Sequence, residues 1–357
     1  MFEKILLKQG NLNKAKYKIY LKRKRSKIEI NYNFAIKLAI SILIILIVIF
    51  IYLKIKMHKI KKNNNHINKK NIDYKSSYFA CFSAMAREEN KYANELISYY
   101  LKLGIDKFIF GDNNLLGTEK LSDVLQTYIN KGIVDIYELF GSDLGQAEFN
   151  QIIYKKYKKK CSWFLYFDFD EYLDIHFENN VSIVLQDFLT NKIFEKCEAI
   201  LFNWLTYTDN DLIYYDKRTL LERFTTSNIE NPINFYVKSI IRGGLNKTIF
   251  YPKQSSHVPD PNVAICDSKG TLLTEYNSFG VSPPVFKYGC LKHFSTKSTE
   301  EYVKKIKRGT NRNLAYRVEE RLENYFKINK FSQEKLKFFE SKFNRSFARI
   351  INEFHDA

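Results

Sequence analysis

The sequence predicts an α/β fold in which a mainly parallel sheet is flanked by helices. Two observations predict it. From about residue 77 to residue 169, short apolar runs of strand length alternate with segments whose apolar residues recur at helical spacing. The composition agrees, because 45% of the 357 residues are hydrophobic and 16% are aromatic, enough for a sizeable core. Strands that alternate with helices in this way are typical of a parallel sheet with short connections.

The alternation gives four strands and three helices in order. Glycines follow the first two helical patterns, at Gly104 and Gly132, where a residue that adopts a left-handed conformation ends a helix. We therefore expect strands at 77–86, 106–112, 133–139 and 162–169, and helices at 94–104, 119–132 and 145–160.

Polar clusters follow three of the predicted strands, at residues 87–90, 112–114 and 168–171. The carboxyl ends of parallel strands meet at one edge of a sheet, and ligands bind beyond that edge. The sequence therefore predicts a binding site built from these three clusters.

Asp168 and Asp170 form a D-x-D pattern directly after one of the most apolar runs of the chain. An unpaired buried carboxylate costs several kcal/mol, so these charges need a partner. Residues two apart on an extended chain point the same way, and paired carboxylates suit Mg²⁺ or Mn²⁺, which keep positions open for substrate phosphates. The alternative is a pair of acids at a solvated strand end, paired to Lys or Arg.

Basic charge is concentrated at the amino terminus. The formal net charge is +18, but 19 of the 57 Lys and Arg residues and only 3 of the 39 Asp and Glu residues lie in residues 1–75. The remaining chain is close to neutral, so no nucleic-acid partner is expected for it. We expect a globular domain at residues 77–310 and a helical segment with amphipathic spacing at 311–357.

Residues 34–53 form an apolar run with the single charge Lys37. A helix of about 20 residues spans a ~30 Å hydrocarbon core, so the run predicts a single-pass transmembrane helix. It is too long for a secretory signal peptide. A basic tail (1–33) precedes it and a flexible stem (54–76) follows. Both flanks are basic, and the larger excess before the helix favours a cytosolic amino terminus.

The five cysteines are scattered and contain no C-x-x-C pair. Neither a zinc site nor a full disulfide framework is indicated. Several lie in apolar stretches, where a buried free thiol is expected.

Other phosphate chemistries fit less well. The chain has no P-loop motif, and no G-x-G-x-x-G follows the first strand. Phosphatases of the haloacid dehalogenase type also carry D-x-D after a strand. That family continues with Thr or Val where this chain has Tyr172, and it usually places the motif on its first strand, whereas here the strand is the fourth.

The ordered set of motifs resembles glycosyltransferases of the GT-A fold, specifically glycosyltransferase family 92 and related family-2-like glycosyltransferases. The resemblance covers roughly residues 78–309. It rests on "AREENKYANELISYYLKLGIDKFIFGDNN", "GQAEFNQIIY", "SWFLYFDFDEYLDI", "ILFNWLTY", "LLERF", "KSIIR" and "LKHFSTKSTEEYVKKIKRG".

The resemblance implies transfer of a sugar, of the hexosyl type, from a nucleotide-diphosphate donor to a hydroxyl of a glycan or glycoconjugate. It implies Mn²⁺ or Mg²⁺ as cofactor. Position by position, it implies donor contacts at Arg87, Glu88, Asp112, Asn113 and Lys297, and metal ligation at Asp168, Asp170 and His293. A hydrogen-bonded core histidine is the alternative for His293.

An inverting transfer also needs a carboxylate that takes the acceptor's proton. The candidates are Asp209, Asp211 and Glu222. Asp209, which follows the "FNWLTYTD" run, is preferred and Glu222 comes next, although Glu222 could instead pair with Arg223. Two other functions stay open: an inactive GT-A-fold scaffold or glycan-binding protein, and a metal-dependent phosphatase. The anchor implies a membrane protein, of the Golgi type with a lumenal catalytic domain if the source is eukaryotic.

Overall fold

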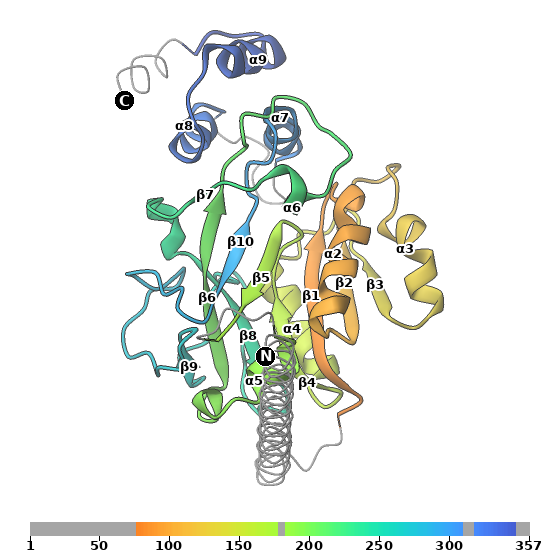
Figure 1. The fold of residues 1–357 in the computed structure, drawn as a ribbon. Helices are drawn as coiled ribbons and strands as arrows, with labels where there is room; N and C mark the ends of the chain where they lie inside the picture. Colours follow the sequence, from red (N-terminus) through yellow and green to blue (C-terminus); the bar gives the residue numbers. More distant parts are fainter. Residues whose placement is uncertain (1–75, 178–182, 310–317, 348–357) are drawn as a thin grey trace, which may run out of the picture. The chain divides into compact units, whose positions relative to one another are not determined.

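The computed structural model of the chain describes residues 76–177, 183–309 and 318–347 (Figure 1). The predicted basic tail, transmembrane helix and stem lie outside the described residues, apart from Ser76. Among the helices that are described, none is both long and apolar enough to cross a membrane.

A ten-stranded sheet forms the centre of the described chain, in the order β3-β2-β1-β4-β8-β6-β10-β5, with β7 and β9 paired to β6 (Figure 1). Its strands are β1 (Tyr78–Ala86), β2 (Lys107–Asp112), β3 (Val134–Glu138), β4 (Cys161–Tyr166), β5 (Glu171–Ile175), β6 (Ala199–Tyr207), β7 (Ser227–Asn228), β8 (Val237–Arg242), β9 (Ile265–Cys266) and β10 (Gly289–His293).

The first four strands are parallel, as predicted, but the sheet as a whole is mixed. Strands β1, β2, β3 and β4 pair in parallel, whereas β8 is antiparallel to both β4 and β6, and β5 is antiparallel to β10. In the second half, β10 and β9 nevertheless pair in parallel with β6. The prediction of a mainly parallel sheet therefore holds for the first four strands, whereas the second half combines parallel and antiparallel pairs.

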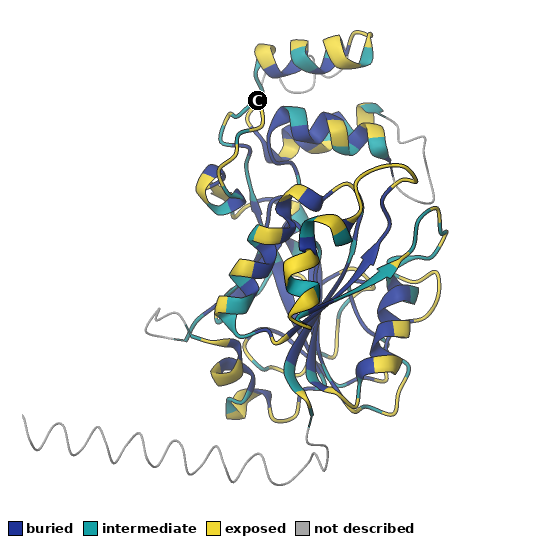
Figure 2. Cartoon of the chain, turned by 90° about the vertical axis from the view of Figure 1, so that its right-hand side faces the viewer, coloured by how far each residue is buried: buried dark blue, intermediate teal, exposed yellow. Residues whose placement is uncertain are grey.

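Helices cover both faces of the parallel half. Helices α2 and α3 pack on one face with Phe82 and Phe110, while α4 packs on the other with Cys81 and Ile109. Buried residues are concentrated in the sheet and on the helix sides that face it (Figure 2). The helices are α2 (Asn90–Leu103), α3 (Leu121–Asn130), α4 (Gln146–Tyr157), α5 (Leu185–Leu189), α6 (Leu220–Arg223), α7 (Thr299–Arg308), α8 (Val318–Ile328) and α9 (Gln333–Phe343), with 3₁₀ turns at Lys192–Phe194 and Pro232–Phe235.

Helix α2 shows how local sequence sets an element. Its buried side includes Tyr92, Leu96 and Tyr100, spaced by four residues, which places them on one face. Gly104 ends the helix with φ 102°, and its N–H donates to the carbonyls of Tyr100 and Leu101. The helix starts at Asn90, four residues before the predicted start.

The carboxyl-terminal helices form a separate apolar cluster. Leu322, Tyr325 and Phe326 of α8 pack against Leu336 and Phe339 of α9, together with residues of α7. The amphipathic spacing at the end of the chain thus corresponds to helices that pack on the domain.

Four of the five cysteines form disulfides, so the expectation of buried free thiols is wrong for them. Cys81 of β1 bonds Cys161 of β4, and Cys197 bonds Cys266 of β9, while Cys290 is a buried free thiol. The bonded residues lie 80 and 69 positions apart. The spacing of the cysteines in the sequence does not predict these pairs, because the two cysteines of each disulfide come together only through the order of the strands in the sheet.

Reduction of these disulfides is expected to destabilise the protein strongly. Closing a loop of this length stabilises a fold by about 4 kcal/mol in the chain-entropy account. We expect the melting temperature to fall by more than about 10 °C in reductant. Alkylation of the unfolded, unreduced chain, read by mass spectrometry, should modify one cysteine, and modification of all five would contradict the pairing.

Candidate active site

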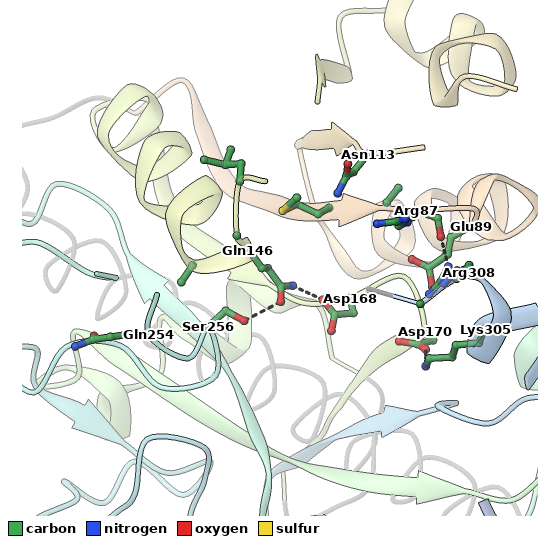
Figure 3. A pocket seen from close by; sticks show the side chains of 16 residues that line it. Arg87, Glu89, Asn113, Gln146, Asp168, Asp170, Gln254, Ser256, Lys305 and Arg308 are labelled. Atoms are coloured by element: carbon green, nitrogen blue, oxygen red, sulfur yellow. Dashed lines mark hydrogen bonds and ion pairs between the residues drawn. The ribbon is translucent and has the colours of Figure 1, made fainter. Parts of the chain in front are cut away.

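The described chain has a cavity at the point where the strand order reverses. Strands β2 and β3 lie on one side of β1 and β4 lies on the other, and a crevice opens beyond the carboxyl ends at such a point. The cavity measures about 410 Å³ (Figure 3). It is lined by Met85, Ala86, Arg87 and Glu89 after β1, Asn113 after β2, Leu144, Gly145, Gln146 and Ala147 at the start of α4, Asp168 and Asp170 after β4, Gln254 and Ser256, and Lys305, Arg308 and Gly309 at the end of α7.

Asp168 lies on this cavity wall and is held by two neighbours. One carboxylate oxygen is 2.7 Å from Nζ of the buried Lys238, and the other accepts from the side-chain amide of Gln146. Gln146 in turn accepts from the Ser256 hydroxyl at 2.7 Å (Figure 3). Burial opposes ionisation of Asp168, but the Lys238 ammonium outweighs it and lowers the pKa of the carboxyl.

Asp170 is more deeply buried, with a side chain 5% exposed. Its Oδ2 lies 3.0 Å from Nζ of Lys297 and 3.2 Å from Nζ of Lys305. Burial again opposes the charge, yet these two ammonium groups hold the pKa of Asp170 well below its usual value. Both aspartates are therefore ionised and paired to lysines, which is the alternative that the sequence left open beside metal binding.

His293 ends β10 beside these carboxylates. Its Nε2 is 3.8 Å from Oδ1 of Asp170, and its ring stacks near Trp204 with centroids 4.0 Å apart. Burial lowers the pKa of His293 to about 3, so the imidazole is neutral, which is its metal-binding form. Its Nδ1 is buried without a hydrogen-bond partner among the described residues.

The described residues hold no cluster of three His, Cys, Asp or Glu side chains arranged as a metal site. Asp168 and Asp170 nevertheless supply the donor set that Mg²⁺ or Mn²⁺ uses when substrate phosphates complete its coordination. Lys238, Lys297 and Lys305 contact these carboxylates. The site fits a divalent cation once the lysines have another anion to pair with.

The predicted donor residues divide into two groups. Arg87 and Asn113 line the cavity, whereas Glu88, Asp112 and Lys297 do not. The Asp112 carboxylate instead accepts from the backbone N–H of Leu121 at 2.7 Å and caps α3. Glu88 is exposed with φ 54°, and Lys297 reaches the site through its contact with Asp170.

Asp209 and Glu222, the predicted base candidates, do not line the cavity. The buried Asp209 carboxylate accepts from Lys335 of α9, at 2.8 Å to Oδ2, and from the Tyr325 hydroxyl of α8. Exposed Glu222 caps α6 by accepting from Thr219. It does not pair with Arg223, which bonds Glu301 at 2.7 Å. The structure gives both carboxylates local structural contacts.

Glu89 belongs to the polar cluster predicted at residues 87–90, although no individual role was expected for it. Gln146, Lys305 and Arg308 also line the cavity and were not predicted as site residues. Burial raises the pKa of Glu89, whose Oε1 is 3.6 Å from Arg308. The one available signal was that Lys305 and Arg308 lie three positions apart, on one face of a helix.

Comparisons with known proteins give little beyond this geometry. No family model and no curated protein matches the chain. Among solved structures, the chain is similar to S. aureus TarS, a glycosyltransferase, with 13% identity and a TM-score of 0.35. The match covers 74% of this chain and 49% of that one, so it spans about half the length of TarS.

Proposed function

We propose that the chain is a glycosyltransferase that moves a sugar, of the hexosyl type, from a nucleotide-diphosphate donor to a hydroxyl of a glycan or glycoconjugate, with inversion. One observation carries the proposal: two ionised aspartates and a set of cationic side chains surround one cavity at the switch point of the sheet. The resemblance of the ordered motifs to glycosyltransferase family 92 supports the same reaction class.

The charges around the cavity favour a diphosphate. The cavity is lined by Arg87, Lys305 and Arg308. Lys238 and Lys297 do not line it, but they contact Asp168 and Asp170 respectively. Burial also raises the pKa of the nearby Glu171 carboxyl, which weakens its negative charge. The surroundings are therefore cationic on balance, which stabilises the charge that develops on a leaving diphosphate.

Asp168 and Asp170 are the residues that would hold Mn²⁺ or Mg²⁺, with His293 next to them. When bound, such an ion supplies Lewis-acid stabilisation of the leaving diphosphate. Because lysines pair with both carboxylates, metal binding has to compete with three ammonium groups. A diphosphate offers those ammonium groups a new partner, so metal and nucleotide should bind cooperatively.

Calorimetry of nucleoside diphosphates with Mn²⁺ or with chelator tests this proposal. We expect one nucleoside diphosphate to bind with micromolar Kd in Mn²⁺ and at least about tenfold more weakly in chelator, a coupling of about 1.4 kcal/mol. Mn²⁺ alone should bind weakly. Absence of nucleotide binding under every metal condition would overturn the proposal. An affinity for Mn²⁺ that is the same with and without nucleotide would contradict cooperative binding of the two.

Glu89 is proposed as the base. Of the carboxylates that line the cavity, Asp168 and Asp170 hold the metal, which leaves Glu89. Burial raises the pKa of Glu89, which makes its carboxylate a stronger proton acceptor. The base must be deprotonated, so kcat should rise with pH through an inflection above the usual glutamate value.

Replacement of Glu89 tests this role. Glu89→Gln should lose at least about 10²-fold in kcat and lose that inflection, while nucleoside diphosphate still binds. An unchanged pH profile in the variant would exclude this role for Glu89.

The membrane anchor at residues 34–53 is part of the proposal. A cytosolic amino terminus would place the catalytic domain across the membrane. The two disulfides support a catalytic domain on the non-cytosolic side of the membrane. Disulfides persist in oxidising compartments such as the secretory lumen or the bacterial periplasm. In a eukaryote this corresponds to a Golgi enzyme with a lumenal catalytic domain.

A further inference from the structure

A second cavity adjoins the first. It measures about 260 Å³ and shares Glu89, Lys305 and Arg308 with the first cavity, so these three side chains form a common wall. We propose that this second cavity binds a phosphate group, separate from the diphosphate of the donor. The inference rests on the proposed function only in that the first cavity holds the donor.

The charges of the second cavity suit an anion. Its lining includes five cationic side chains, Lys91, Lys297, Lys304, Lys305 and Arg308, against three acids, Glu88, Glu89 and Glu301. Glu301 is already neutralised, because its buried carboxylate lies 2.7 Å from Arg223 and 3.1 Å from Lys91. Outside the lining, Lys297 and Lys305 also pair with Asp170, and Lys304 pairs with Glu300. With Arg223 included, six cations face five carboxylates, namely Glu88, Glu89, Glu301, Asp170 and Glu300, so one positive charge remains for a ligand.

A buried hydroxyl in the lining has no partner. Thr296 is 1% exposed, lines the second cavity, and its Oγ1 makes no hydrogen bond within the described part of the chain. Leaving a buried polar group unsatisfied costs about 1–3 kcal/mol. A phosphate oxygen in the cavity would accept from this hydroxyl and remove that cost.

The start of α2 adds a third contribution. Lys91 and Tyr92, in the first turn of this 14-residue helix, line the second cavity. The N-cap residue Glu89 makes no side-chain capping bond, and no acidic residue lies in the first turn. The Glu89 carboxylate lies next to this end but bonds none of its N–H groups, so the positive end of the helix dipole still favours an anion.

A phosphate here could belong to the acceptor or be free phosphate. Because the two cavities share a wall of single side chains, a phosphate in the second cavity lies next to the donor cavity. An acceptor also has to lie next to the donor. An acceptor that carries a phosphate monoester or diester would then be anchored by this cavity. Free phosphate would occupy the same contacts without affecting the choice of acceptor.

The first test measures binding of inorganic phosphate to the full chain in detergent, with the first cavity saturated by nucleoside diphosphate and Mg²⁺. We expect one phosphate to bind, with Kd raised about tenfold by Thr296→Val and by Lys91→Met. Neither residue lines the first cavity, so nucleotide affinity should not change. Lys307→Met is the matched control, because it removes a charge from α7 outside both cavities.

Phosphate binding that is absent, or equal in wild type and both variants, would overturn the inference while leaving the nucleotide result intact. Loss of nucleotide binding in wild type would instead overturn the proposed function. The second test compares transfer to a phosphorylated sugar and to its neutral counterpart. Preference for the phosphorylated acceptor, abolished by Thr296→Val, assigns the phosphate to the acceptor, and phosphate binding without preference assigns it to free phosphate.

Discussion

Asp170→Asn is expected to lower the transfer rate by about 10²–10³-fold, the usual size of a lost charge-stabilising group in an active site. Asn keeps the shape of the side chain but removes the negative charge. That charge would hold the metal, and it also keeps Lys297 and Lys305 at 3.0 and 3.2 Å. Rates with a nucleotide-sugar donor and the melting temperature should be measured together.

Two further variants make this result interpretable. Asp168→Asn should cause a similar loss, and its side chain, 34% exposed, is less buried than that of Asp170. Asp174→Asn is the control: this carboxylate is 42% exposed, lies on β5 and pairs with Lys292. Transfer should be normal in Asp174→Asn, and normal transfer in Asp170→Asn would contradict the site.

Asp209→Ala is expected to destabilise the protein by about 1–3 kcal/mol, because it leaves the buried Tyr325 hydroxyl and part of the Lys335 ammonium without an acceptor. Asp209 and Lys335 are each 2% exposed and 2.8 Å apart, and Lys335 keeps a second pair with the more exposed Asp211 at 2.7 Å. The Asp209–Lys335 pair joins the end of β6 to α9, and the Tyr325 hydroxyl joins it to α8. We expect the melting temperature to fall by roughly 5 °C.

The double variant Asp209→Ala with Lys335→Met separates structure from catalysis. With the second charge removed as well, much of the stability should return, as in other buried pairs replaced by apolar groups. Transfer should return with it. If Asp209→Ala melts like wild type yet transfers no sugar, Asp209 acts in catalysis, as the sequence suggested.

The first half of the sheet and the two aspartates were predictable from sequence because both are local patterns. Strand–helix alternation and helix-ending glycines such as Gly104 depend on neighbouring residues. Asp168 and Asp170 follow an apolar strand within the same short stretch. Carboxyl ends of parallel strands then converge for a general geometric reason, so Arg87 and Asn113 were correctly placed on the cavity.

The partners of those aspartates were not predictable, because they are distant in sequence. Lys238 lies 70 positions after Asp168, and Lys297 and Lys305 lie 127 and 135 positions after Asp170. The surroundings of Asp209 were not predictable for the same reason. It follows a strand, like the cavity residues, but its partner Lys335 lies 126 positions further on. Position after a strand does not reveal whether a carboxylate faces a cavity or a packed helix.

Identification of the released product tests the central claim most directly. The full chain in detergent should be incubated with a panel of nucleotide sugars, a glycan mixture and Mn²⁺, alongside simple phosphate esters. The account predicts release of one nucleoside diphosphate with gain of a sugar on an acceptor, lost in Asp170→Asn. Release of inorganic phosphate from the simple esters, or no turnover of any nucleotide sugar, would contradict it, the first indicating a phosphatase and the second a scaffold or glycan-binding protein.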